Sequence, residues 1–425
     1  MNKTLQFEAH LENKYWLTSH IKQELFVYLS LKGGKAPEKQ ERIPLNISLV
    51  VDRSGSMSGD KLNYVKKAVD FVIDNLKSDD VLSIVQYDDE IDVVASSAKV
   101  TNKKALHEKV KGIQARNMTN LSGGMMEGYA QVKSTQSNGY VNRVLLLSDG
   151  LANAGITAPE QLQQIAQKKF REAGIALSTF GVGSDFNEVL MTNLSEYGGA
   201  NYYFIDMPDK IPQIFAQELE GLLSVVAQNT TLEVVFPQSY LKCTQVYGFP
   251  ANISPDKVSV NFNDVVAEEE KAVLIKFEVI RTPDEPFVLK TRLQYDDVID
   301  KMERITDELD LRMELTTDEH AYRAGINAKV HEQTALFTAN DLFEQAIKVA
   351  DGRDFEKAKQ IIAQAKASLD AYFKLMPPSE ELKKQYDSIV AYGEKLDQMK
   401  NMSQMDYMMS QKMSRSANYM ARKKK

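Results

Sequence analysis

Cysteine is nearly absent from this sequence, which has a single one, Cys243, among 425 residues. An internal disulfide is therefore impossible, and a lone thiol fits a protein of a reducing compartment. The first residues also lack the continuous apolar core of a secretory signal, because polar and apolar residues alternate there. From these absences we expect a cytoplasmic protein.

Long apolar runs and an excess of positive charge are missing too. No stretch approaches the roughly 18 apolar residues of a membrane-spanning helix, so we expect no transmembrane segment. The formal net charge of −7 argues against a general nucleic-acid binder, although the chain ends in the short basic stretch ARKKK. The 43% hydrophobic and 26% charged residues are typical of a globular protein with roughly two to four domains.

The centre of the chain alternates short apolar strands with amphipathic helices. Strands are expected at 45–51, 81–87, 143–147, 175–180 and 202–205, and helices at 61–76, 103–113, 124–132, 159–173 and 209–223. Continuous apolar strands that alternate with helices are typical of a parallel sheet covered on both faces. We therefore predict an α/β domain, mainly parallel and doubly wound, over residues 44–224.

Strands with period-two alternation flank this domain on both sides. One set lies in residues 1–43 and the other in 225–316, where prolines separate runs such as KVSVNF and AVLIKFEVI. Two N-terminal strands alone are marginally stable in water, so we expect them to pair with the second set. The α/β domain is then an insertion into an antiparallel β-sandwich.

The last part of the chain has helical periodicity. Apolar residues recur at helical spacing on either side of the turn DGRD, which predicts an αα-hairpin within a helical domain at 317–400. Residues 401–425 are rich in methionine and end in the basic cluster. We expect a partly disordered tail there, although methionine also suits a helix that binds a partner.

A polar, glycine-spaced loop follows the first strand of the α/β domain. The run ISLVV leads directly into Asp52, Ser54 and Ser56, which lie at alternate positions. In extended or gently turning backbone, alternate residues point the same way, so one carboxylate and two hydroxyls can converge. An oxygen-only cluster suits Mg²⁺, Mn²⁺ or Ca²⁺ and not zinc, which favours nitrogen and sulfur.

A second strand end repeats this signal. The run RVLLL leads into Ser148 and Asp149, and ligands of such sheets bind at the carboxyl ends of the strands. If the two strands are neighbours, Asp149 lies beside Asp52, and two adjacent carboxylates repel unless a cation lies between them. Thr119, just before a Gly-Gly and the start of a helix, can complete the shell.

The five candidates resemble the metal-ion-dependent adhesion site of von Willebrand factor type A domains: Asp52, Ser54, Ser56, Thr119 and Asp149. Residues 45–223 are similar to that family in length and order of elements, and the whole arrangement is similar to bacterial members and to inter-α-trypsin inhibitor heavy chains. The resemblance implies that the two serines and the threonine bind the ion directly and the aspartates largely through water. A partner's acidic side chain takes the open position. One departure is Met118, where many relatives carry glycine.

We therefore predict a metal-dependent protein-binding module, adhesive or scaffolding, that holds a divalent ion, most simply Mg²⁺, and captures an acidic residue of a partner protein. No enzyme is expected, because the sequence has no Gly-x-Ser-x-Gly elbow, Cys–His pair or phosphate loop. One alternative is a metal-assisted hydrolase or phosphotransferase, for which Asp185 is the nearest candidate base. Another is a scaffold that binds through its helical C-terminal region.

Overall fold

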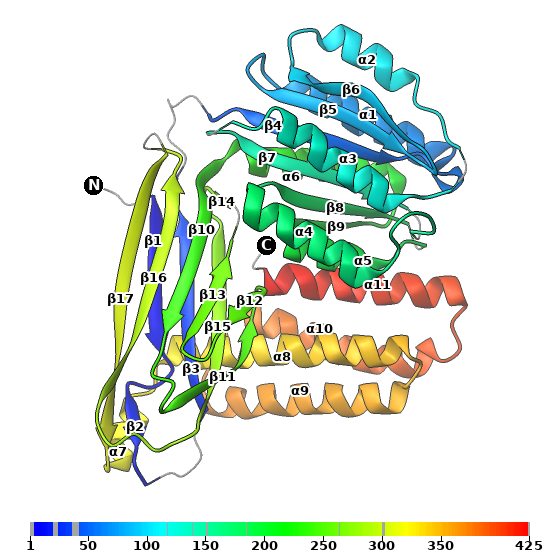
Figure 1. Cartoon of the computed structure of the whole chain (residues 1–425). Helices are drawn as coiled ribbons and strands as arrows, with labels where there is room; N and C mark the ends of the chain where they lie inside the picture. The colour runs from blue at the N-terminus through cyan, green and yellow to red at the C-terminus, as the bar shows by residue number, and fades with distance from the viewer. Residues whose placement is uncertain are drawn as a thin grey trace.

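The computed structural model describes residues 4–19, 24–35, 42–116, 118–137, 139–149, 152–183, 185–262, 264–299 and 302–423. Figure 1 shows an α/β domain above a set of C-terminal helices, with a β-sandwich beside both. Lys424 and Lys425, the last residues of the basic cluster, lie outside the described residues.

The sheet of the α/β domain has the strand order β6-β5-β4-β7-β8-β9. Its strands are β4 (Leu45–Asp52), β5 (Val81–Tyr87), β6 (Ile91–Lys99), β7 (Val141–Ser148), β8 (Ala176–Val182) and β9 (Gly199–Ile205). All neighbours are parallel except β5 and β6, and every residue of the central strands β4 and β7 is buried. This arrangement confirms the predicted fold class, and it makes β4 and β7 direct neighbours.

Helices cover both faces of this sheet, as continuous apolar strands require. One face packs against α1 (Asp60–Asn75), α2 (Lys103–Lys111) and α6 (Ile211–Leu223). The other packs against α3 (Leu121–Ser134), α4 (Pro159–Ala173) and α5 (Glu188–Tyr197). The sequence prediction did not include α5. The short 3₁₀ turns are η1 (Gly55–Met57) and η2 (Pro208–Lys210).

Helix α3 lies unusually close to the sheet because glycines face it. A β-carbon on Gly124 would lie 2.5 Å from the ring of Tyr87, and one on Gly128 would lie 2.4 Å from a methyl carbon of Val50. Both are far inside normal contact distance, so a larger residue would push the helix outward. This close approach positions the N-terminal end of α3, which follows Thr119, against the carboxyl edge of the sheet.

The sandwich consists of two layers with the strand orders β1-β3-β15-β11 and β12-β13-β10-β16-β17-β2, and β14 lies beside β10. Strand β2 pairs with β17 in parallel, whereas the other described strand pairs of the sandwich are antiparallel. Its strands are β1 (Leu5–Leu11), β2 (Tyr15–Leu17), β3 (Glu24–Gly33), β10 (Val225–Val235), β11 (Leu241–Tyr247), β12 (Ala251–Ile253), β13 (Lys257–Asn261), β14 (Val265–Val266), β15 (Glu270–Val279), β16 (Phe287–Asp297) and β17 (Glu303–Thr316). Strand β3 pairs with both β1 and β15. The predicted insertion of the α/β domain into a sandwich is thereby confirmed.

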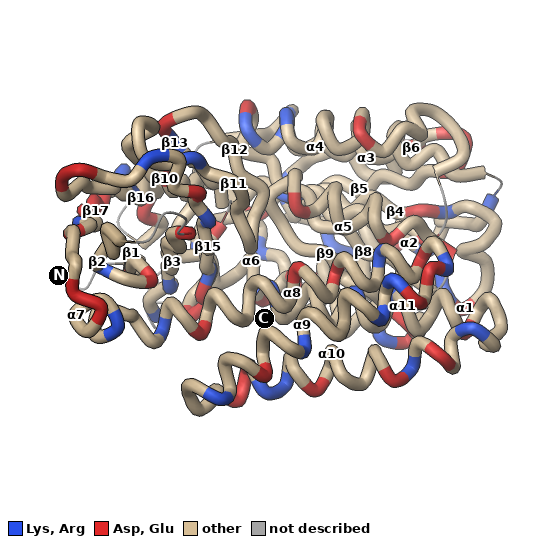
Figure 2. The backbone as a smooth tube through the Cα atoms, turned by 90° about the horizontal axis from the view of Figure 1, so that it is seen from below, with Lys and Arg blue, Asp and Glu red and all other residues tan. Residues whose placement is uncertain are grey.

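The C-terminal helices are α7 (Glu319–Ala324), α8 (Ala328–Asp351), α9 (Phe355–Leu375), α10 (Glu380–Met399) and α11 (Gln404–Arg422). Helices α8 to α11 share one apolar core. In Figure 2, acidic and basic residues are interspersed along α9 and α10, the outermost of these helices in that view. In the described part of the chain, no helix has the length and apolar character needed to cross a membrane.

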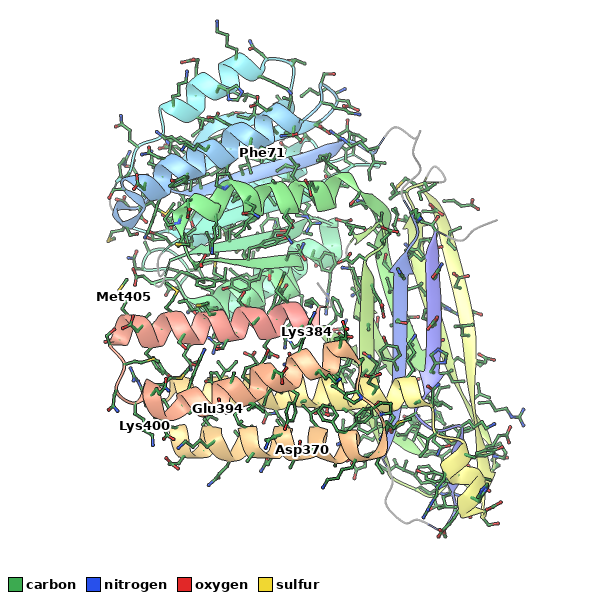
Figure 3. The ribbon with its side chains drawn as sticks, turned by 180° about the vertical axis from the view of Figure 1, so that it is seen from behind. Phe71, Asp370, Lys384, Glu394, Lys400 and Met405 are labelled. Carbon is green, nitrogen blue, oxygen red and sulfur yellow. The ribbon has the colours of Figure 1, made fainter. Side chains whose placement is uncertain are left out.

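The structure differs from the expectation of a disordered tail, because residues 404–422 form a complete helix. Figures 1 and 3 show α11 between the α/β domain and the other C-terminal helices, with Met405 at its start. The buried face of α11 is mostly polar: Tyr407, Gln411, Lys412, Arg415, Asn418 and Tyr419. Hydrophobic periodicity cannot reveal such a helix, since ion pairs and hydrogen bonds hold it in place.

Candidate metal centre

Asp52 lies at the end of β4, and its carboxylate is fully buried. One oxygen, Oδ1, accepts a hydrogen bond of 2.8 Å from the backbone N–H of Ser54. The other, Oδ2, accepts one of 2.7 Å from the hydroxyl of Ser148, at the end of the neighbouring strand β7. The carboxylate therefore has a fixed position at the junction of the two central strands.

The loop after β4 carries the cluster across to Asp149. The hydroxyl oxygens of Ser54 and Ser56 are 3.1 Å apart, and the hydroxyl of Ser56 donates to Oδ1 of Asp149 over 2.7 Å. Asp149 is fully buried as well. The structure thus joins four of the five predicted residues in one chain of hydrogen bonds at the carboxyl edge of the sheet.

Thr119 reaches the same edge through its backbone. Its N–H donates to the side-chain oxygen of Asn153 over 2.9 Å, and its carbonyl accepts from the N–H groups of Asn153 and Ala154. Both partners follow β7, so the loop before α3 is tied to the segment that leads away from Asp149. Thr119 is buried. Among the described residues, however, it is not part of the chain of hydrogen bonds that joins the other four candidates.

An ion network around the buried carboxylate of Asp88 holds the two loops in register. The carboxylate of Asp88 lies 3.1 Å from Nε of Arg53 and 3.0 Å from Nε of Arg116. The backbone N–H of Arg116 also donates to the carbonyl of Arg53 over 2.7 Å. Because Arg53 lies inside the Asp52–Ser56 loop and Arg116 precedes Thr119 by three residues, the network fixes the threonine loop beside the first one.

The electrostatics of the cluster favour a cation. Burial raises the pKa of Asp52 to about 6, against hydrogen bonds from Ser54 and Ser148 that lower it, and the nearby charge of Asp149 raises it further. Two buried carboxylates with hydroxyl neighbours form a hard, oxygen-only donor set, which suits Mg²⁺ and related ions. A divalent ion at this edge would offset the burial cost of both charges. The residues therefore fit the ion that the sequence predicted.

Sequence reasoning missed Lys61 as a member of this cluster. Its ammonium lies 2.5 Å from Oδ2 of Asp149, and its side chain is 24% exposed. The available signal was its place in the first turn of α1, directly after the loop that holds the serines. The phenol of Tyr87 was missed as well; it donates to the carbonyl of Leu147 over 3.1 Å and lies 3.5 Å from Asp52 Oδ2.

Asp185, the candidate base of the enzyme alternative, has a different environment. It is exposed in the loop between β8 and α5. It is not part of the chain of hydrogen bonds, among the described residues, that runs from Asp52 to Asp149. Its electrostatic effect reaches Lys412 of α11, whose pKa burial lowers to about 8. The geometry thus associates Asp185 with the α11 contact more than with the candidate centre.

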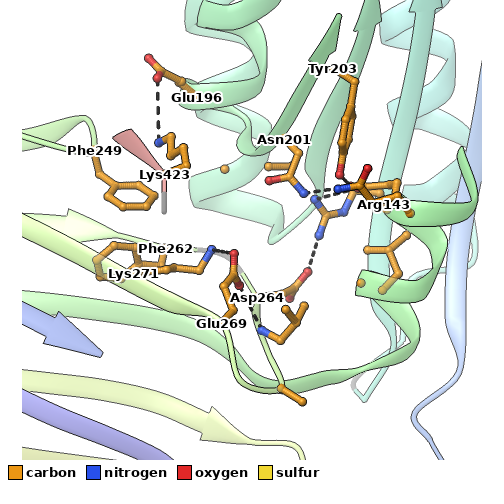
Figure 4. A pocket seen from close by; sticks show the side chains of 18 of the residues that line it. Arg143, Glu196, Asn201, Tyr203, Phe249, Phe262, Asp264, Glu269, Lys271 and Lys423 are labelled. Atoms are coloured by element: carbon orange, nitrogen blue, oxygen red, sulfur yellow. Dashed lines mark hydrogen bonds and ion pairs between the residues drawn. The ribbon is translucent and has the colours of Figure 1, made fainter. Parts of the chain in front are cut away.

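A separate cavity of about 400 Å³ lies where the α/β domain, the sandwich and the end of α11 meet (Figure 4). Arg143 of the α/β domain donates to Asp264 of the sandwich over 2.6 Å, and both side chains are buried. Beside them, Glu218 accepts hydrogen bonds from Asn201 and Tyr203. These polar groups join neighbouring elements, so we assign the cavity to the domain junction and not to the candidate centre.

Comparison with known proteins identifies similar chains. A family profile described as the von Willebrand factor type A domain matches residues 46–217. The protein YfbK of Escherichia coli (strain K12) is 29% identical over 206 residues, which are 48% of this chain and 36% of that protein. Inter-alpha-trypsin inhibitor heavy chain H3 of Rattus norvegicus is 26% identical over 219 residues, 48% of this chain and 24% of that one. The matches thus span well under half of either relative.

A solved structure extends the similarity beyond this region. The von Willebrand factor type A protein from Catenulispora acidiphila superposes with a TM-score of 0.71 at 15% sequence identity. The superposition covers 89% of this chain and 88% of that one. At this identity the likeness concerns the fold, and its coverage includes most of the sandwich and the C-terminal helices together with the α/β domain.

Proposed function

Residues 46–217 form a von Willebrand factor type A domain, and from this premise we propose that the protein is a metal-dependent binding module that captures an acidic side chain of a partner protein. Domains of this kind generally mediate protein–protein interactions, and they commonly bind a divalent metal ion. The observation that carries the proposal is the hydrogen-bonded cluster of Asp52, Ser54, Ser56 and Asp149 at the carboxyl edge of the sheet.

In this proposal, the hydroxyls of Ser54, Ser56 and Thr119 would hold the ion directly, and Asp52 and Asp149 would hold it largely through water. Mg²⁺ is the proposed ion, with Mn²⁺ or Ca²⁺ as substitutes, because all five donors are oxygens. When bound, the ion supplies positive charge at a buried edge and a coordination position for one carboxylate oxygen of the partner. The chain's own residues would fix that position.

Binding is favoured over catalysis by the position of the titratable groups. A hydrolase would need a base within hydrogen-bond reach of the reacting atoms. Asp52 and Asp149 are both buried and engaged by Ser54, Ser148, Ser56 and Lys61. These contacts suit carboxylates that hold a cation.

The proposal predicts that Thr119→Val abolishes Mg²⁺-dependent partner capture. Valine keeps the shape of threonine and leaves the backbone bonds to Asn153 and Ala154 in place, but it removes the hydroxyl that would bind the ion. Immobilised protein is incubated with a lysate of the source cell in Mg²⁺ or in EDTA, and retained proteins are quantified by mass spectrometry. The exposed Thr101→Val in the same domain is the matched control.

The decisive step uses the protein that the unchanged chain and Thr101→Val retain in Mg²⁺ and lose in EDTA. Substitution of its contact aspartate or glutamate by the amide should abolish binding to the purified chain. Retention of the same protein by Thr119→Val in Mg²⁺, or unchanged binding after the partner's acidic residue is replaced by the amide, would contradict the proposal.

A further inference from the structure

The ion pair between Lys61 and Asp149 is placed where the proposed ion would act. Asp149 is fully buried, and its two oxygens are engaged by the loop and the helix that follow β4: Ser56 donates to Oδ1 over 2.7 Å, and the ammonium of Lys61 lies 2.5 Å from Oδ2. One carboxylate of the candidate pair therefore has a cation of the chain itself as its partner.

The fold holds this ammonium at the edge of the sheet. Lys61 belongs to the first turn of α1, and its stem reaches across to the ends of β7 and β8, where a β-carbon on Gly183 would lie 3.8 Å from its Nζ. About three quarters of its side chain is covered, since 24% is exposed. A four-carbon stem with rotatable bonds can nevertheless withdraw its ammonium toward solvent without moving the helix.

Other nearby cations already have partners of their own. Arg53 pairs with Asp88 and Asp92, and Arg116 pairs with Asp88 and Glu90. Within the part of the chain that the structure describes, the one recorded ion pair to a candidate metal ligand is that of Lys61 with Asp149. Its positive charge therefore acts on the same carboxylates that would attract the divalent ion.

We propose that Lys61 is a tethered cation that competes with the divalent ion for Asp149 and thereby sets the metal affinity of the centre. This inference rests on the proposed function, since it concerns the same ion. Without the ion, the ammonium neutralises the buried carboxylate; when the ion enters, the ammonium must leave Oδ2 or remain beside a second positive charge. Both courses weaken metal binding.

A functional consequence follows for the partner. A centre with an internal competitor holds its ion weakly alone and more firmly once the partner's carboxylate adds negative charge. The displaced ammonium of Lys61 remains at the same edge and can pair with that incoming carboxylate. Metal loading and partner binding would then reinforce each other, which restricts stable occupancy to the complex.

The test measures Mg²⁺ and Mn²⁺ binding to metal-stripped full-length protein by isothermal titration calorimetry. Lys61→Met removes the charge and keeps the stem, and we expect it to bind Mg²⁺ about tenfold more tightly than the unchanged chain. The exposed Lys104→Met on α2 loses the same charge far from the cluster and should bind like the unchanged chain. Lys61→Arg keeps the charge and should show no gain in affinity.

The sign of the change separates competition from a structural role. If Lys61 only positioned Asp149, its loss would weaken metal binding. Equal or weaker binding by Lys61→Met, with one Mg²⁺ still bound by the unchanged chain, would overturn this inference and leave the proposed function intact. Failure of both chains to bind either ion would overturn both.

A second readout is the thermal stability of the protein with and without metal. Without metal, Lys61→Met should melt at a lower temperature than the unchanged chain, because Asp149 is left buried without its cation. Saturating Mg²⁺ should remove this difference in melting temperature. If Lys61→Met does not fold, Lys61→Gln, which retains a hydrogen-bond donor for Asp149, carries the same expectations. The inference would be overturned if Mg²⁺ raised the melting temperature of the variant by no more than it raises that of the unchanged chain.

Discussion

Asp52→Asn should bind Mg²⁺ at least 30-fold more weakly than the unchanged protein while keeping its fold. Two unit charges about 4 Å apart interact by about 4 kcal/mol at an effective dielectric constant of about 20. Loss of half of this energy, about 2 kcal/mol, weakens the Mg²⁺ affinity about 30-fold. Asparagine retains an oxygen that can accept from the N–H of Ser54. Calorimetric titration of Mg²⁺ measures the affinity, and circular dichroism checks the fold.

The matched control for this variant is Asp89→Asn, which removes one charge from an exposed residue in the turn after β5. It should bind Mg²⁺ as the unchanged chain does. A simple effect of net charge would weaken both variants alike. Equal Mg²⁺ affinity of Asp52→Asn and the unchanged chain would exclude Asp52 from the centre.

The same carboxyl gives a pH signature. Burial raises the pKa of Asp52 from 3.8 to about 6. Its protonated form therefore stabilises the ion-free fold below pH 3.8, and this contribution is lost as the pH rises through about 6. Because the ion needs the ionised form, Mg²⁺ affinity should fall roughly tenfold for each pH unit below about 6. An ordinary carboxyl would show little change down to about pH 5, and titrations across this interval distinguish the two cases.

Arg415→Met should destabilise the attachment of α11 by about 3 to 5 kcal/mol, because it leaves the buried carboxylate of Glu188 without its cationic partner. The guanidinium, whose side chain is 8% exposed, lies 2.8 Å from Glu188 of α5, 3.3 Å from Glu344 and 2.5 Å from Asp351, the last two on α8. One residue thus joins the α/β domain to the C-terminal helices. Hydrogen exchange followed by mass spectrometry measures the loss of protection in 404–422.

The exposed pair of Arg323 with Glu319 supplies the control for this experiment. The side chain of Arg323 is 79% exposed, so Arg323→Met should change stability by less than about 0.5 kcal/mol. Protection of β4 and β7 should be unaffected by either variant, because their burial does not depend on α11. Unchanged protection of α11 in Arg415→Met would show that apolar packing around Tyr419 holds the helix in place without the ion network.

The sequence predicted the elements whose apolar pattern is regular. Strands β4 and β7 are buried throughout their length and are mostly apolar, and helix α1 has a continuous buried stripe. It failed where polar residues are buried or apolar ones are few. Strand β17 is largely exposed and charged, so its alternation carries little hydrophobic signal. Helix α11 buries Lys412 and Arg415 against carboxylates and carbonyls that lie far away in the sequence.

The candidate centre was predictable to the extent that it depends on strand ends. Asp52 and Asp149 follow buried strands, and parallel neighbours must bring such residues together. Ser148 and Lys61 could not be assigned in this way, because serine before a strand end and lysine in a first helical turn are common in purely structural roles. Their contacts with the two carboxylates depend on side-chain directions that only the folded chain supplies.

The most direct test of the account is a crystal of the full-length protein grown or soaked with Mn²⁺, with data collected at the manganese absorption edge. We predict one anomalous peak at the carboxyl edge of the sheet, in contact with the hydroxyls of Ser54, Ser56 and Thr119 and bridged by water to Asp52 and Asp149. A peak elsewhere, or none at this edge in crystals that saturate with Mn²⁺ at other sites, would contradict the central claim that these five residues form a divalent-ion centre.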